Sequence, residues 1–167
     1  MDPIINKVAE SGLITIDLEE LHVPGERVLF DIRSWLYEEL ILREKDFREQ
    51  IKELDWSAFS GKHVAVTCSA DAVIPVWAYM LIAASLAPYA QTTVFGSLER
   101  LEESLFLERL NCLDLSVYKD QRVIIKGCSA VPVPVSAYFH LTSLLQPIVK
   151  SVMYGEPCST VPVYKRK

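Results

Sequence analysis

The chain carries one stretch of sequence twice, and this repeat limits the folds that it can adopt. Residues 42–97 read again as residues 101–156, and outside one short segment each position meets its counterpart 59 residues later. The shared positions include apolar, acidic, proline and glycine residues, so a common composition does not explain them. The repeat predicts an internal duplication into two halves with the same series of helices and strands. Identical pairs include Phe47 and Phe106, Pro75 and Pro134, Tyr79 and Tyr138, Pro88 and Pro147, and Gly96 and Gly155.

The register of the repeat slips once, at a pair of cysteines. Cys68 begins a Cys-Ser-Ala sequence in the first copy, and Cys128 begins the same sequence in the second after an additional Gly127. The spacing of 59 residues then returns at Pro134. These two equivalent cysteines are therefore the first candidates for functional residues.

Helical and strand patterns alternate in each copy. Amphipathic helices are expected at residues 42–54 and 98–110, and β-branched runs at 63–67 and 122–126 indicate buried strands. Pro75 and Pro134 suit the first turn of the apolar helices that follow, because the missing N–H would be unpaired there. Strands are expected at 92–95 and 151–154, stopped by Gly96 and Gly155, and further strands at 28–32 and 13–18.

This alternation predicts an α/β fold with a mostly parallel sheet and helices on both of its faces. We expect the halves 42–97 and 101–156 to share one sheet within a single domain of residues 1–167, which is an ordinary length for one domain. Half of the residues are hydrophobic, so the chain can bury a substantial core. The formal net charge of -5 argues against a broad basic face, and no nucleic-acid partner is expected.

The opening residues show no basic segment followed by an apolar core, so we expect no secretory signal and a cytoplasmic location. Residues 72–90 carry no charge and have the length of a membrane span. Pro75 and Pro88 bracket them, however, and the second copy of this segment contains His140, Thr142 and Gln146. A helix buried in the fold is therefore expected, with no membrane partner. In the cytoplasm the four cysteines would stay reduced, which favours metal binding, thiol chemistry or packing over disulfides.

Three cysteines follow predicted strands and are expected at one edge of the sheet. In parallel sheets the carboxyl ends of the strands form the usual ligand site. Cys68, Cys128 and Cys158 would meet there and bind zinc, iron or an iron-sulfur cluster through their thiolates. Asp71 and Glu156 are candidate additional ligands. The signal is weak, because the chain has no Cys-x-x-Cys pair.

Other interpretations of the same residues stay open. Small cysteines can fill tight strand ends, Asp71 can cap the helix that follows Pro75, and the phenols of Tyr79 and Tyr138 can serve packing or reach back to the cysteine loops. A thiol enzyme using Cys68 or Cys128 is one alternative function. A protein-interaction module, docking a partner or a second copy through the apolar segment 161–163, is the other, so a homodimer is a candidate assembly.

Several motifs together resemble a bacterial family, family twenty-four-eighty of the domains of unknown function. They are Thr-Cys-Ser-Ala-Asp at residues 67–71, Trp-Ala-Tyr at 77–79, Lys-Gly-Cys at 126–128 and Tyr-Gly-Glu-Pro-Cys-Ser-Thr-Val-Pro at 154–162. The resemblance extends from residue 6 to the end of the chain. It implies no specific activity, but it implies a link with iron-sulfur cluster metabolism and with iron-sulfur assembly proteins as partners.

Overall fold

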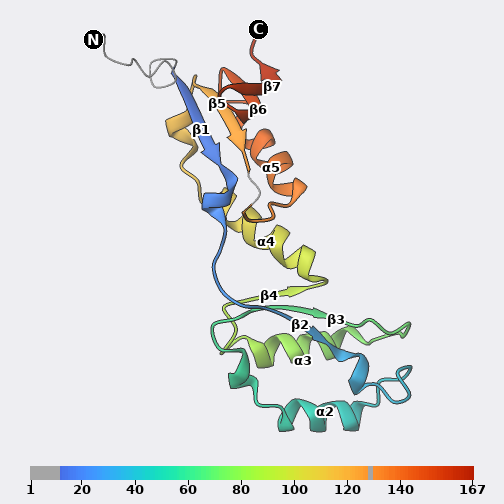
Figure 1. The fold of residues 1–167 in the computed structure, drawn as a ribbon. Helices are drawn as coiled ribbons and strands as arrows, with labels where there is room; N and C mark the ends of the chain where they lie inside the picture. The colour runs from blue at the N-terminus through green and yellow to red at the C-terminus, as the bar shows by residue number, and fades with distance from the viewer. Residues whose placement is uncertain (1–11, 128–129) are drawn as a thin grey trace. The chain divides into compact units, whose positions relative to one another are not determined.

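The structure is a computed structural model that describes residues 12–127 and 130–167, and these divide into two compact units. Unit 1 contains described residues 12–23 and 105–167, and unit 2 contains Pro24–Ser104. The chain therefore begins in unit 1, builds all of unit 2, and returns to unit 1 (Figure 1). The second passage between the units falls within helix α4, Leu98–Asn111. The single domain 1–167 expected from the sequence stays a prediction.

The strands form two sheets, so the expectation of one shared sheet is wrong. Unit 1 has a four-stranded sheet in the order β1-β5-β6-β7, which is parallel except for the last strand. Unit 2 has a parallel three-stranded sheet in the order β2-β3-β4. The strands are β1 Leu13–Asp17, β2 Arg27–Asp31, β3 His63–Thr67, β4 Thr92–Phe95, β5 Arg122–Lys126, β6 Ser151–Glu156 and β7 Ser159–Lys165.

The two sheets arise because the first two strands pair with different copies of the repeat. Leu13 of β1 lies opposite Arg122 of β5, whereas Arg27 of β2 lies opposite His63 of β3. Each copy thus receives one strand from the amino-terminal segment. Gly155 lies inside β6, so it does not stop that strand as expected; Gly96 does follow the end of β4.

Four α-helices occur in the described residues, close to their predicted positions: α2 Glu44–Glu53, α3 Val76–Leu86, α4 Leu98–Asn111 and α5 Val135–Leu145. Pro75 and Pro134 stand at the N-cap positions of α3 and α5, immediately before the first turn. Among the described residues, none of the helices has both the length and the apolar character needed to cross a membrane.

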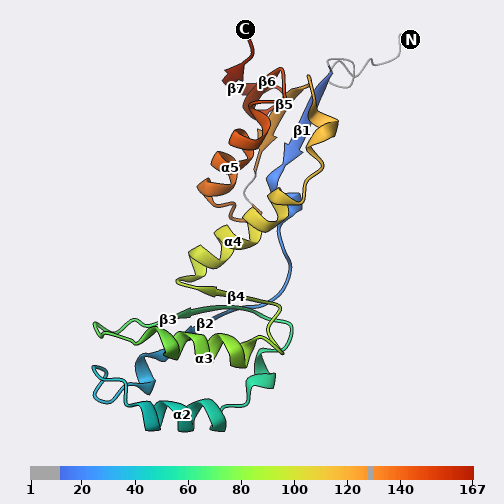
Figure 2. The same cartoon turned by 180° about the vertical axis from the view of Figure 1, so that it is seen from behind.

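Helices lie on both faces of the unit 2 sheet, which confirms the predicted layering there. On one face, α3 lies between the sheet and α2 in both views (Figures 1 and 2). The core on this face contains Phe47 of α2, Val64 of β3 and Ile82 of α3, all with no exposed surface. On the other face, Arg27 of β2 forms an ion pair with Glu102 of α4, with 2.5 Å between Nε and Oε1.

The core of unit 1 repeats this arrangement with the second copy of the sequence. Phe106 of α4, Val123 of β5 and Leu141 of α5 are the counterparts of Phe47, Val64 and Ile82 and are equally buried. Each unit follows the same order of strand, 3-10 helix, α-helix, 3-10 helix, strand, α-helix and strand. This shared order supports the duplication, which stays a prediction, and it lets each residue of one unit be compared with its counterpart in the other.

Candidate functional site

The carboxyl ends of the first strands carry equivalent aspartates. Asp17 ends β1 and Asp31 ends β2, and each carboxylate accepts a hydrogen bond of 3.0 Å from a backbone N–H at the start of the next 3-10 helix. An oxygen in this place satisfies a donor that the short helix leaves unpaired. Each unit therefore places a carboxylate at the edge of its sheet where ligands usually bind.

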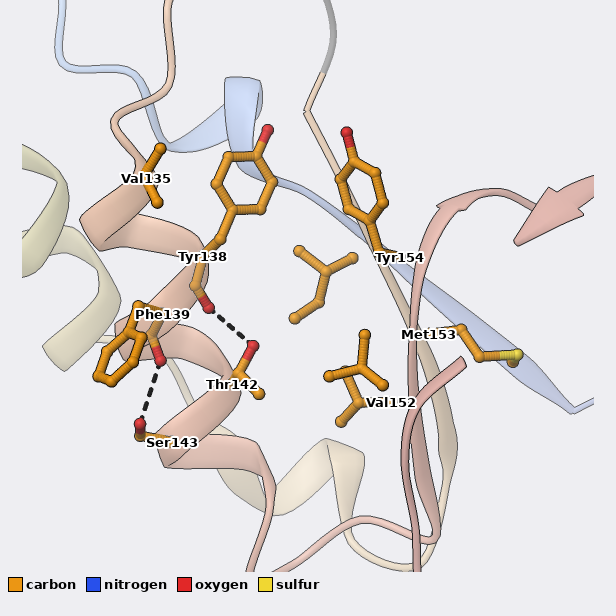
Figure 3. Close-up of a pocket in the computed structure, with 10 residues that line it drawn as sticks. Val135, Tyr138, Phe139, Thr142, Ser143, Val152, Met153 and Tyr154 are labelled. Atoms are coloured by element: carbon orange, nitrogen blue, oxygen red, sulfur yellow. Dashed lines mark hydrogen bonds between the residues drawn. The ribbon is translucent and has the colours of Figure 1, made fainter. Parts of the chain in front are cut away.

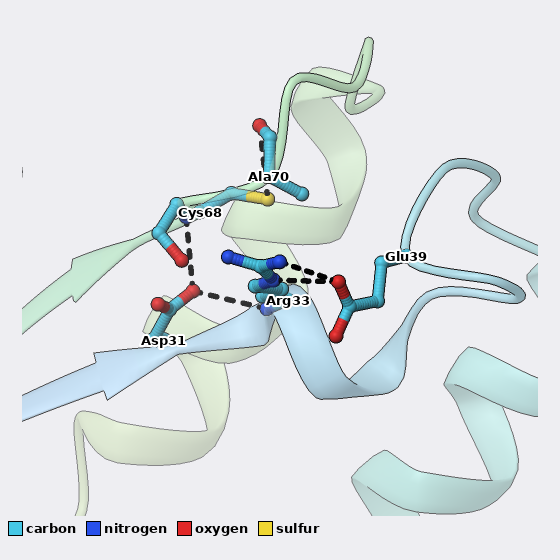
Figure 4. A network of polar contacts seen from close by, with 6 residues as sticks. Asp31, Arg33, Glu39, Cys68 and Ala70 are labelled. Carbon is cyan, nitrogen blue, oxygen red and sulfur yellow. Dashed lines mark hydrogen bonds and ion pairs between the residues drawn. The ribbon is translucent and has the colours of Figure 1, made fainter.

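In unit 2 this carboxylate holds the loop that carries Cys68. Asp31 accepts a second hydrogen bond of 3.0 Å from the backbone N–H of Ser69, directly after the cysteine (Figure 4). Cys68 is half-buried against the unit 2 core, and its Sγ lies 3.9 Å from the carbonyl oxygen of Ala70. The interpretation of cysteine as a packing residue at a strand end therefore fits Cys68.

The surroundings of Cys68 shift the pKa values of two neighbours. Burial raises the pKa of Asp31, but hydrogen bonds from Ser69 and the backbone N–H of Arg33 outweigh it, and the pKa of Asp31 is lowered. Burial raises the pKa of Tyr79, and electrostatic interactions with the neighbouring Cys68 and Asp31 raise it further. Tyr79 therefore stays protonated at neutral pH and can donate its phenolic hydrogen toward the cysteine loop.

In unit 1 the same edge is built around Lys126, the last residue of β5. Its Nζ lies 3.4 Å from Asp17 Oδ2 and 3.6 Å from Glu156 Oε1. The hydrogen bond to Asp17 and the charge of Glu156 raise the pKa of Lys126. The hydroxyl of Tyr138 occupies the space beside Gly127, where a Cβ would collide with it. The hydroxyl of Tyr138 thus lies beside the residue that precedes Cys128, and a hydrogen bond from it to the cysteine loop stays a prediction.

The cysteines are divided between the two sheets. Cys68 follows β3 in unit 2, whereas Cys158 lies exposed in the turn between β6 and β7 in unit 1. The expected meeting at the edge of one sheet is therefore wrong for these two. Cys128 lies outside the described residues. Within the described segments, no group of three histidine, cysteine or acidic side chains has the geometry to hold a metal ion.

The two additional candidate ligands have different surroundings. Glu156 forms an ion pair with Lys126, while Asp71 is exposed in the loop before α3. No side chain caps α3 at its N-cap residue, Pro75, so the predicted capping by Asp71 is wrong. The role of Asp71 as a ligand stays a prediction.

An apolar groove lies between α5, β6 and β7 in unit 1, and we call it the α5 groove (Figure 3). Its volume is about 580 Å³, within the range of ligand-binding clefts. Val135 is 82% exposed and Phe139 is 77% exposed, although both are large apolar side chains. Figure 3 shows the hydroxyls of Tyr138 and Tyr154 together at one end. The lining residues are Ile125, Val135, Tyr138, Phe139, Thr142, Ser143, Val152, Met153, Tyr154 and Val163.

Unit 2 has a smaller hollow at the equivalent place, between α3 and β4. Its volume is about 120 Å³. All six of its lining residues are the counterparts of residues that line the α5 groove: Val66, Tyr79, Ala83, Thr93, Val94 and Phe95. The α5 groove also has Val163 from β7 as a wall, and β4 has no such neighbouring strand in the described chain. The β7 strand therefore distinguishes the two hollows.

The sequence interpretation missed the α5 groove. Apolar residues all around a helix predict burial, so the α5 sequence indicated a core helix. A usable signal was the polar pair Thr142 and Ser143 in place of Ala83 and Ala84, which separates α5 from its counterpart α3. The exposed Val161 and Val163 of β7 belong to the apolar segment that the sequence proposed as a docking surface.

Comparison with models of known protein families identifies the family of this chain. Residues 2–166 match the model of the family described as "Protein of unknown function (DUF2480)". Neither the curated proteins nor the solved structures contain a match to this chain.

Proposed function

This chain belongs to the DUF2480 family, and from its geometry we propose that it is a protein-interaction module whose α5 groove binds an apolar segment of a partner protein. The observation that carries this proposal is the exposure of Val135 and Phe139 at the rim of a groove of about 580 Å³. Soluble monomers seldom leave large apolar side chains gathered at one place unless the place binds something.

The groove suits an apolar peptide segment for two reasons. Its walls are mostly aliphatic and aromatic, and side chains of this kind form the centre of protein interfaces. The hydroxyl of Thr142 already donates to the carbonyl oxygen of Tyr138 at 2.7 Å, and that of Ser143 donates to the carbonyl of Phe139 at 3.1 Å. Because these hydroxyls are satisfied within α5, they add little polar cost when a partner covers them.

Selection of peptides from a random displayed library on the full chain checks this proposal. We expect the selected peptides to be rich in apolar residues and to bind Val135→Lys at least about tenfold more weakly than wild type, because covering a valine contributes about 1.5–3 kcal/mol. Val76→Lys is the matched control, since Val76 is 74% exposed at the equivalent position of α3. Failure to enrich any peptide, or equal losses for both variants, would contradict the proposal.

We also propose a thiolate metal site, zinc or an iron-sulfur cluster, at the edge of the unit 1 sheet. The specific support is the parallel pairing of β5 with β6. Cys128 follows β5 and Cys158 follows β6, and neighbouring parallel strands end at the same edge. Glu156, the last residue of β6, is a further candidate ligand from the same unit. Iron-sulfur assembly proteins would then be the natural partners.

Purification without oxygen, followed by measurement of metal and inorganic sulfide per chain, tests the metal site. We expect close to one zinc or one cluster per chain in the wild type and a loss of most of it in Cys158→Ser. Cys112→Ser is the control, because Cys112 is exposed and follows the end of a helix, α4, instead of a strand. Metal-free wild-type protein that is fully folded would rule the site out.

A further inference from the structure

The outer edge of β4 offers unpaired backbone groups. β4 is the last strand of the unit 2 sheet, and Gly96 donates its N–H to the carbonyl of Val66 on the inner side at 2.9 Å. Backbone groups alternate from side to side along a strand, so the N–H and C=O groups of Thr93 and Phe95 point away from the sheet. Within the described residues, no strand pairs with this edge.

The β4 edge lacks the features that usually prevent strands from pairing. Its sequence, Thr-Thr-Val-Phe, contains no charge and no proline, and Phe95 is 66% exposed. One of the two outer strands of the unit 1 sheet, β7, contains Pro162 and Lys165, and its pairing with β6 has a register irregularity. Proline, lysine and bulges are the common protections of free edges. The β7 edge of the unit 1 sheet therefore carries these protections, and the β4 edge of the unit 2 sheet carries none of them.

In unit 1, the equivalent edge belongs to β6 and is paired with an antiparallel strand, β7. Val152 and Tyr154 of β6 are the counterparts of Thr93 and Phe95, and they pair in antiparallel register with Tyr164 and Val161 of β7. Through this pairing, Val163 becomes a wall of the α5 groove. An antiparallel strand thus fits beside this type of edge and covers the adjoining hollow with an apolar side chain.

We propose that β4 pairs in antiparallel register with β4 of a second copy of this chain, with Val94 on the two-fold axis. Thr93 of each copy then lies opposite Phe95 of the other, and the two pairs supply about four backbone hydrogen bonds. Two identical strands bring like charges together unless they are uncharged. The segment from Gln91 to Leu98 carries no charge, so self-pairing meets no repulsion.

The side chains around β4 fit this occupant. Phe95 packs against Tyr79 with ring centroids 4.8 Å apart, so both lie on the α3 face of the sheet. In the paired sheet, Phe95 of the second copy stands beside Thr93, next to the hollow of about 120 Å³ that Ala83 also lines. A two-fold axis perpendicular to the sheet places both α3 helices on this face. In the dimer, β4 of the second copy therefore lies beside β4 and its hollow in the way that β7 lies beside β6 and the α5 groove in unit 1.

Sedimentation of the full chain over about 1–100 µM checks the proposal. We expect a dimer in the wild type and a monomer in Phe95→Lys, because the lysine charges would be placed beside the apolar hollow. Phe139→Lys is the control: it changes another exposed phenylalanine, in the α5 groove, and should remain dimeric. A monomeric wild type, or a dimer lost only in Phe139→Lys, would overturn the β4 pairing.

A cross-link identifies the strand register independently of those variants. In Val94→Cys the two introduced thiols would face each other in a close cross-strand pair, within disulfide range, and mild oxidation should join the chains. In Ser97→Cys the thiols would be roughly 20 Å apart at 3.3 Å per residue and should not join. A dimer without the Val94→Cys cross-link would exclude this interface. Peptide binding by the α5 groove is measured separately, so its failure leaves this outcome unchanged.

Discussion

Replacing Phe47 with alanine is expected to lower the free energy of unfolding of unit 2 by about 3–5 kcal/mol, the usual range for removing a buried phenylalanine. Phe47 has no exposed surface, and its ring lies 5.4 Å from that of Trp35 and 5.9 Å from that of Trp77, centroid to centroid. It connects α2 to α3 and the sheet through one cluster. Its loss leaves a cavity that neighbouring rings cannot fill without leaving their own contacts.

Urea unfolding followed by tryptophan fluorescence measures this effect. All three tryptophans, Trp35, Trp56 and Trp77, belong to unit 2, so the fluorescence midpoint reports on that unit. Phe139→Ala is the control, because Phe139 is 77% exposed and its removal should change the midpoint little. Phe106→Ala removes the equivalent buried ring from unit 1 and should act mainly on the circular dichroism signal. Equal midpoints for Phe47→Ala and wild type would contradict the core described for unit 2.

Replacing Gly155 with alanine is expected to cost roughly 2–5 kcal/mol of unit 1 stability, from backbone strain together with overpacking. Gly155 has a φ of +115°, which side chains disfavour, and a Cβ there would lie 2.6 Å from the carbonyl oxygen of Ser159. Since that oxygen belongs to the backbone of β7, the strand itself has to shift. The substitution should therefore loosen β7 from β6 and remove Val163 from the α5 groove.

The equivalent glycine of unit 2 provides the matched control. Gly96 has a φ of +132°, but a Cβ there would meet the flexible side chain of Arg100, at 3.1 Å from Cγ. Gly96→Ala should cost only the strain, about 1–3 kcal/mol. Urea unfolding of both variants, with hydrogen exchange of the β7 amides, distinguishes the two effects. Exchange in Gly155→Ala as slow as in wild type would show that β7 has not moved.

Most individual elements could be predicted from local sequence. The runs His63–Thr67 and Arg122–Lys126 are the observed strands β3 and β5 residue for residue, because β-branched residues between polar positions mark a buried strand clearly. Helix starts were marked by Pro75 and Pro134. The β7 strand was missed because Pro162 argues against a strand, and it is tolerated there only because β7 lies at the edge of its sheet.

The sheet arrangement could not be predicted in this way. Whether β1 joins β5 or β2 depends on pairings between distant segments, and the composition of β1 favours neither. Cys68 and Cys158 each follow a strand, as predicted. They were also expected at one edge of a single sheet, and this was wrong because the strands form two sheets. The α5 groove was hidden because exposed and buried apolar residues look alike in sequence.

The insertion of unit 2 into unit 1 also has a consequence for synthesis of the chain. β1 leaves the ribosome early, yet its partner is β5, and Leu13 waits until Arg122 has been translated before their pairing can form. Unit 2 closes within Pro24–Ser104 and can fold during that interval, since domains fold as units during synthesis. The order of translation therefore predicts an order of assembly. Unit 2 folds first, and β1 stays unpaired until β5 and the rest of unit 1 have been synthesised.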